Sequence, residues 1–208
     1  MTATLSSTTG TLSNAEVLTG DRSSVFHSWS AQGSFSGLPI AGGQGSTVWD
    51  FDGKRYLDAV SSWWVNVFGH ANPRINARIR DQLDSLEHVM LAGFTHQPVI
   101  ELSERLVQIT PAGLDRVFYA DNGSAGVEVA LKMAFHWFHN RGEHRRTKFI
   151  ALENGYHGET LGALAVGDIP LYRRVYAPLL AETLFAPSPE PYLVQPGESP
   201  AECVARPA

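Results

Sequence analysis

The turn Asp121-Asn122-Gly123-Ser124 stands between a short apolar run and a helical pattern. A helix that begins at such a turn leaves its first backbone N–H groups unpaired, and its dipole favours an anion there. Gly123 lets the backbone approach a ligand closely, while the Ser124 hydroxyl can cap the helix and donate to a phosphate oxygen. The turn therefore predicts a phosphate site, although the same residues also fit an ordinary strand-to-helix turn with a polar cap.

A second polar segment, Asn154 to Thr160, follows another apolar run and contains Tyr156 and His157 between glycines. In α/β folds, ligands gather where the sheet strands end. The Tyr156 ring can stack on a planar ligand there, with His157 beside it to tune that ligand. The alternative is that both side chains only anchor the loop.

Paired indoles occur in Ser61-Ser62-Trp63-Trp64. Adjacent tryptophans commonly belong to a hydrophobic core. The two serines beside them, however, make the segment amphipathic, and indoles of this kind can form the wall of a substrate cavity. Both interpretations stay open from the residues alone.

Other chemistries lack their sequence signatures. No G-x-G-x-x-G or G-x-x-x-x-G-K-[ST] segment is present, so a dinucleotide or ATP site is not supported. No G-x-S-x-G segment supports a serine hydrolase. His136 and His139 share a helical pattern but have no third ligand near them in the sequence, so no metal site is expected.

Composition narrows the setting of the protein. The 208 residues are 43% hydrophobic with a net charge of −5, which fits a folded globular protein and gives no basic patch for nucleic acid. Cys203 is the only cysteine, which excludes an internal disulfide framework. No apolar run is long enough for a membrane span and no signal peptide is evident, so we expect a soluble cytoplasmic protein.

Turn and helix signals organise the first half of the chain. Asp52-Gly53 divides residues 43–58 into two short runs and predicts a β-hairpin. Apolar residues recur at helical spacing over residues 73–86, after Asn72-Pro73, and again over residues 98–109. Two amphipathic helices packed on a sheet are therefore expected.

The segment around the first polar turn predicts a βαβ unit. Residues 116–120 form a short apolar strand pattern, residues 125–140 a helix and residues 147–153 a second strand. A strand, helix and strand within about forty residues imply a parallel sheet with a right-handed crossover. The predicted fold class is α/β.

The two ends of the chain differ from this pattern. Residues 1–24 begin with a Ser- and Thr-rich stretch and are expected to form a disordered tail, while residues 187–208 hold six of the twelve prolines and show no periodicity. A compact domain rarely ends on such a stretch, so the native protein is expected to continue. The predicted divisions are an N-terminal segment over 25–90, the first part of a large domain over 91–186, and a truncated Pro-rich end.

Four motifs in order, SSWWVNVFGHANP, HVMLAGFTHQP, ADNGSAGVEVALKMA and ENGYHGETLGALAVGD, carry a family resemblance. From about Val25 to Ser188, the chain resembles the class III aminotransferases, which have the aspartate aminotransferase-like fold type I of pyridoxal-phosphate (PLP) enzymes. The resemblance implies an incomplete version of that fold, PLP as cofactor, and a homodimer with an active site at its interface.

The resemblance assigns roles to the residues of the polar segments. It implies that Gly123 and Ser124 hold the PLP phosphate, that Tyr156 packs on the pyridine ring with His157 nearby, and that Trp63 lines the substrate pocket. Trp64 and Trp29 are further candidates for that pocket, to which Tyr156 would also contribute.

No catalytic residue is assigned, because the family's Schiff-base lysine and its pyridinium-pairing aspartate lie in the second half of the fold. The chain has three lysines, Lys54, Lys132 and Lys148, and none matches the family's lysine. We therefore expect the 208 residues alone to lack turnover.

Within the family, the motifs are most similar to the branch that serves biotin synthesis. That branch implies S-adenosylmethionine as amino donor and 8-amino-7-oxononanoate as acceptor, with 7,8-diaminononanoate as product. His27-Ser28-Trp29 replaces the His-Pro-Tyr usual in the branch and is more like omega-amino acid:pyruvate aminotransferases. A non-catalytic truncated product that binds PLP or dimerises is the third possibility.

Overall fold

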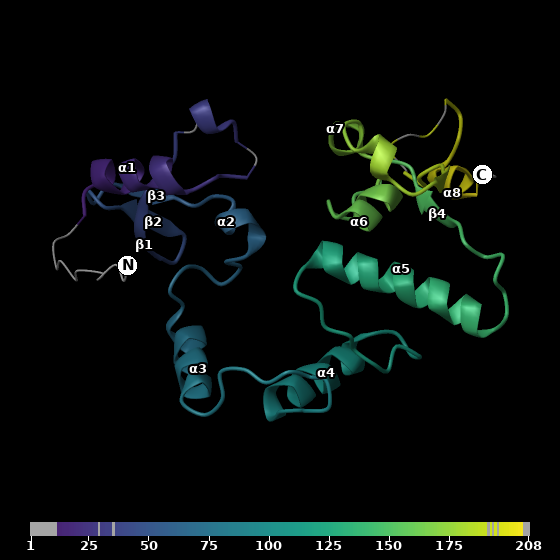
Figure 1. The fold of residues 1–208 in the computed structure, drawn as a ribbon, viewed down its shortest axis with the longest axis horizontal. Coiled ribbons are helices and arrows are strands. Elements are labelled where there is room, and N and C mark those ends of the chain that lie inside the picture. Colours follow the sequence, from purple (N-terminus) through teal and green to yellow (C-terminus); the bar gives the residue numbers. More distant parts are fainter. Residues whose placement is uncertain are drawn as a thin grey trace, which may run out of the picture. The chain divides into compact units, whose positions relative to one another are not determined.

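A computed structural model of the chain describes residues 12–28, 30–34, 36–190, 192, 194 and 196–205. The chain separates into two compact units, Met1–Gln97 and Pro98–Ala208. Figure 1 shows the elements of both units along the sequence.

The first unit contains an antiparallel sheet with a helix tied to its turn. Its elements are α1 (Asn14–Ser24), the 3-10 turn η1 (Gln32–Ser34), β1 (Ile40–Gln44), β2 (Thr47–Asp50), β3 (Arg55–Leu57), α2 (Ser61–Trp64) and α3 (Pro73–Leu83). The strands lie in the order β1-β2-β3. The predicted hairpin is confirmed: β2 and β3 flank Asp52-Gly53, and Gly53 has the positive φ of 86° that this turn needs.

Helix α1 contacts the hairpin turn through one residue. The Asn14 side chain accepts a hydrogen bond from the Phe51 N–H at 2.9 Å, and the Asn14 N–H donates to Asp52 at 3.1 Å. The helix begins at a capping box in which Ser13 and Glu16 bond reciprocally. The expectation of a disordered tail is therefore wrong for residues 14–24, because composition concealed this helix-start signal. Residues 1–11 lie outside the described part.

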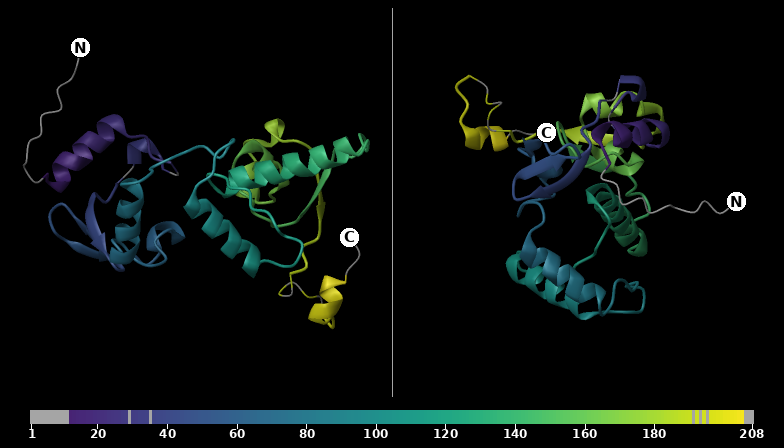
Figure 2. Two further views of the ribbon diagram at one scale, coloured as in Figure 1. Left: turned by 90° about the horizontal axis from the view of Figure 1, so that it is seen from below. Right: turned by 90° about the vertical axis from the view of Figure 1, so that its left-hand side faces the viewer.

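The second unit combines a long helix with a small parallel sheet. Its elements are α4 (Gln97–Ile109, which begins at the unit boundary), α5 (Gly123–Asn140), β4 (Phe149–Leu152), α6 (Leu161–Val166), α7 (Pro170–Arg173), η2 (Ala177–Leu179), β5 (Thr183–Ala186) and α8 (Pro200–Val204). Strands β4 and β5 pair in parallel, with Phe149 opposite Thr183 and Leu152 opposite Ala186. The views in Figure 2 show α5 beside the α6 and α7 segment, and α5 and α6 pack together.

The predicted βαβ unit is wrong in its strands, although the α/β class is confirmed. Residues 116–120 lie outside any strand, because no neighbouring segment in the described part of the chain pairs with them. The parallel pair forms one crossover later, through α6 and α7, and β5 was not predicted. The helix predicted over 125–140 begins two residues earlier, at Gly123, and the strand predicted over 147–153 is shorter than expected.

Burial is concentrated in one short helix. Among the described residues, the buried apolar side chains are Ala163, Leu164, Ala165, Val166 and Cys203. Helices α3 and α4 follow the predicted spans, except that α3 stops at Leu83, and neither buries a residue. Their predicted packing on a sheet is therefore not seen in the described part of the chain.

Candidate functional site

The polar turn before α5 has the features of an anion site. Asn122 is the N-cap, and its side chain accepts a hydrogen bond from the Ala125 N–H at 2.9 Å. The N–H groups of Gly123 and Ser124 lie in the first helical turn and find no acceptor among the described residues. A Cβ added at Gly123 would meet no atom within 4 Å, so the space beside its backbone is open. An eighteen-residue helix thus presents two backbone donors to a ligand.

The loop that carries Tyr156 is held at its base by Asp168. The Asp168 carboxylate accepts from the Asn154 N–H at 3.1 Å, and the Asp168 N–H donates to the Gly155 carbonyl at 2.7 Å. Asn154 has a φ of 60°, a conformation that asparagine tolerates better than most residues. The Tyr156 ring remains 57% exposed and meets the Tyr172 ring edge-on, with centroids 5.7 Å apart. The loop therefore presents a flat aromatic surface.

The two polar segments, predicted separately, lie against each other. The Glu159 N–H donates to Ser124 Oγ at 3.2 Å, and Gly158 is buried against the same serine. A side chain at Gly158 would overlap Ser124, so only glycine allows this approach. The Tyr156 hydroxyl donates to Glu159 at 3.1 Å. Burial, followed by the hydrogen bond to Glu159, raises the pKa of Tyr156, so the ring stays neutral at pH 7.

This arrangement fits a phosphate joined to a planar ring. Ser124 Oγ accepts from the loop and keeps its own proton to donate to an anion. The unpaired N–H groups at the start of α5 suit the same anion. The exposed Tyr156 ring, on the loop that contacts Ser124, supplies a stacking surface. The structure thus brings Gly123, Ser124 and Tyr156 into one region of the second unit.

His157 and the three lysines make other contacts than Gly123, Ser124 and Tyr156 do. His157 is exposed and lines a groove with residues of β4 and Gly155. Lys54 lies over the Tyr56 ring at 5.0 Å, and Lys148 pairs with Glu182 at 3.0 Å. Lys132 lies farther along α5 than the phosphate turn.

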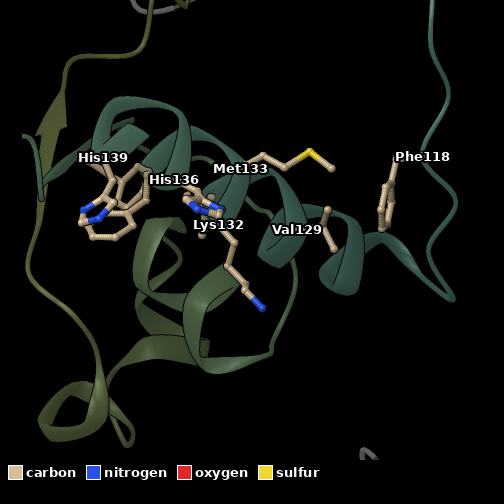
Figure 3. A pocket seen from close by; sticks show the side chains of 9 residues that line it. Phe118, Val129, Lys132, Met133, His136 and His139 are labelled. Atoms are coloured by element: carbon tan, nitrogen blue, oxygen red, sulfur yellow. The ribbon is translucent and has the colours of Figure 1, made fainter. Parts of the chain in front are cut away.

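A large apolar groove lies apart from the polar segments. It measures about 740 Å³ and runs along α5, where Phe118, Val129, Lys132, Met133, His136 and His139 line it (Figure 3). Its lining is almost wholly apolar and includes neither Ser124 nor Tyr156. His136 and His139 belong to this groove, and no group of three or more metal-binding side chains occurs among the described residues.

In the first unit, the indoles of Trp63 and Trp64 are exposed. Their exposed fractions are 60% and 74%, and the rings meet edge-on with centroids 6.0 Å apart. The alternative that they form a core is therefore wrong for this chain. They stand on α2, in which all four residues, Ser61 to Trp64, have positive φ angles between 48° and 67°. Such a left-handed turn is crowded for L-residues and requires a local cause.

Asp58 holds this turn through hydrogen bonds. Its carboxylate accepts from the Ser62 N–H at 3.0 Å, from Ser62 Oγ at 2.8 Å and from His70 Nε2 at 2.7 Å. The bonds from the Ser62 N–H, His70 and the Ser62 hydroxyl lower the pKa of Asp58 to about 2. His70 is fixed in turn by two backbone hydrogen bonds with Gly45. No motif in the sequence singled out Asp58 or His70.

The segment His27-Ser28-Trp29, which differs from the His-Pro-Tyr of the biotin branch, is only partly described. His27 contacts Asp21 at 2.9 Å, whereas Trp29 lies outside the described residues. No helix among the described residues has the length and apolar character needed to cross a membrane.

Comparison with known proteins identifies relatives across most of the chain. The sequence profile of the family described as Aminotransferase class-III matches residues 30–208. The adenosylmethionine-8-amino-7-oxononanoate aminotransferase of Helicobacter pylori is 51% identical over 154 residues, which cover 74% of this chain and 35% of that protein. The enzyme of the same name from Geobacter sulfurreducens is 46% identical over 165 residues, covering 79% and 36% respectively.

Solved structures agree in fold. The adenosylmethionine-8-amino-7-oxononanoate aminotransferase of Methanocaldococcus jannaschii superposes with a TM-score of 0.78 at 39% identity, over 83% of this chain and 40% of that one. An (S)-enantioselective omega-transaminase from Thermomicrobium roseum gives a TM-score of 0.82 at 28% identity, over 94% and 44%. The chain thus spans less than half the length of these relatives.

Proposed function

Because the chain belongs to the class III aminotransferase family, whose cofactor is PLP, we propose that it supplies the phosphate and ring contacts of such an enzyme. The observation that carries the proposal is the contact between Ser124 and the loop of Tyr156. The Gly123 and Ser124 N–H groups and the Ser124 hydroxyl would hold the cofactor phosphate. The exposed face of Tyr156 would pack on the cofactor ring, with His157 beside it.

When bound, the cofactor supplies an electron sink that lets an amino group leave one carbon and join another. The residues of this chain bind and orient. Tyr156, kept neutral by its raised pKa, offers an apolar face, and its hydroxyl is occupied by Glu159. Trp63 and Trp64, with Trp29, would form the apolar wall of the substrate pocket. No lysine of this chain is proposed as the catalytic base.

The proposed reaction transfers the amino group of S-adenosylmethionine to 8-amino-7-oxononanoate and yields 7,8-diaminononanoate. Relatives that bear this enzyme's name share 40–51% of aligned residues with the chain. The indole pair suits the apolar chain of such an acceptor. A homodimer is proposed for the working enzyme, as is usual in the family.

Borohydride reduction with PLP, followed by intact mass, tests this proposal on protein purified from its native source. A phosphopyridoxyl adduct, together with 7,8-diaminononanoate formed from S-adenosylmethionine, is the expected result. A species of 22.7 kDa without adduct would instead support the non-catalytic alternative.

An omega-amino acid:pyruvate aminotransferase is the second candidate. His27-Ser28-Trp29 and the likeness to the omega-transaminase of Thermomicrobium roseum favour it. Donor profiling separates the two candidates. Turnover with β-alanine and pyruvate, but none with S-adenosylmethionine, would overturn the biotin assignment.

A further inference from the structure

Glu128 lies one helical turn after Ser124 on α5 and reaches across to α6. Its Oε1 accepts from the Gly162 N–H at 2.8 Å. Hydrogen bonds from the Thr160 hydroxyl and from the Gly162 and Ala163 N–H groups lower its pKa, so the carboxylate is ionised at neutral pH. Thr160, the N-cap of α6, makes no capping bond with its own side chain. Glu128 therefore caps α6 from a different helix.

The Glu128 carboxylate lies close to Gly162, which has no side chain. A Cβ at Gly162 would overlap the Glu128 carboxylate, as one at Gly158 would overlap Ser124. Because residues four apart share a helix face, Ser124 and Glu128 contact the same segment at two points. The segment between those points, residues 158–162, begins two residues after Tyr156.

We propose that Glu128 is a positioning residue, which caps α6 and so fixes the loop of Tyr156 against the phosphate turn. The inference rests on the proposed function of that turn and loop. The phosphate donors belong to α5 itself and do not depend on Glu128. The position of the Tyr156 ring does depend on Glu128, because the loop that carries Tyr156 leads into the start of α6.

Binding of two probes to the full chain separates these roles. Calorimetric titrations with PLP and with inorganic phosphate would compare Glu128→Ala and Glu128→Gln with Glu104→Ala, an exposed glutamate on α4. Glu128→Ala should weaken PLP binding about tenfold, the size of a lost aromatic contact, and leave phosphate binding within about twofold. Glu128→Gln, which keeps an acceptor oxygen, should recover most of the PLP affinity.

Equal weakening of both probes by Glu128→Ala would show a general structural role and overturn the proposal. So would unchanged PLP binding. Tyr156→Ala supplies a cross-check, because adding Glu128→Ala to it should have little further effect on PLP affinity.

Amide hydrogen exchange of residues 156–163 tests the positioning step without ligand. Glu128→Ala should speed exchange there at least about tenfold, and Glu104→Ala should not. If the unsubstituted chain binds neither probe, the proposed cofactor function fails, whereas the exchange result still decides whether Glu128 holds the loop. Unchanged exchange in Glu128→Ala would overturn the proposal whatever the titrations show.

Discussion

Ser61 to Trp64 place four successive L-residues in the left-handed region of the backbone. Each such residue costs about 1–2 kcal/mol relative to a right-handed conformation. Asp58 offsets part of this cost through its hydrogen bonds to Ser62. Residues held in strained conformations are concentrated at binding and catalytic sites, which agrees with a substrate-facing role for the two indoles.

Relief of that strain should stabilise the first unit. At Ser61, whose φ is 50°, replacement by glycine removes the crowding but adds flexibility to the unfolded chain. The Ser61→Gly variant should raise the free energy of unfolding by about 0.5–1 kcal/mol, measured by urea titration with tryptophan fluorescence. Ser61→Ala keeps the Cβ and should give no gain. An equal gain in both variants would contradict the prediction.

Asp58 should make the indole pair sensitive to acid. Its pKa is lowered from 3.8 to about 2 in the folded protein, so its contribution is complete above pH 3.8 and is lost as the pH falls from 3.8 to about 2. The near-UV circular dichroism of Trp63 and Trp64 should weaken in that window. Asp58→Asn should give a weak signal throughout, and an unchanged titration in this variant would exclude Asp58 as the responsible group.

At the scale of elements, the sequence predicted helices and a turn whose signals lie within the segment itself. The helices α3, α4 and α5 follow apolar residues at helical spacing, and Asp52-Gly53 marks the hairpin. Helices α1 and α8 were missed although each begins with a capping box, Ser13 with Glu16 and Ser199 with Glu202. These boxes lie in Ser- and Pro-rich stretches, whose composition concealed them.

Strands were harder to predict because a strand forms only with a pairing partner, and the strand's own sequence does not specify which segment that is. Residues 116–120 have a strand composition but lack a partner in the described chain, while Thr183–Ala186 pairs with β4 across a crossover of thirty residues. The candidate site shows the same division. The sequence identified Ser124 and Tyr156 as candidate binding residues. It did not predict that Ser124 contacts the Tyr156 loop through Glu159, or that Glu128 caps α6, because both contacts arise from packing between segments.

An added methyl group at Gly162 should weaken the contact between α5 and α6. Because a Cβ there would displace the Glu128 carboxylate from its hydrogen bond with the Gly162 N–H, Gly162→Ala should lower the free energy of unfolding by about 0.5–1.5 kcal/mol. Gly126→Ala is the matched control on α5, since its Cβ would meet only Ala120 at 4.0 Å. That variant should be neutral or stabilising by up to about 1 kcal/mol. Thermal unfolding checks both, and equal effects would contradict the predicted clash.

At the scale of the whole chain, apolar exposure dominates. Large apolar side chains such as Phe68, Val67, Leu171 and Ile150 are more than 70% exposed, while the buried apolar residues of the described part are few. Large exposed apolar surface is typical of regions that contact another surface, such as a second protein. The net charge of −5 opposes association between copies of the chain only weakly.

The isolated chain should therefore bind a hydrophobic dye and associate with itself. Fluorescence of 8-anilinonaphthalene-1-sulfonate should rise strongly on addition of the chain, and light scattering should show a mass that increases with concentration. A monomer of 22.7 kDa at every concentration, without dye binding, would contradict this prediction.

The turn at Ser61 to Trp64 has the handedness of a mirror-image helix. D-amino acids adopt that conformation without the crowding that L-residues meet there. Semisynthesis with D-serine at position 61 would keep the hydroxyl group while reversing only the stereocentre. In the segment that carries the two indoles, a D-residue thus fits the native backbone better than the L-residue that occurs there.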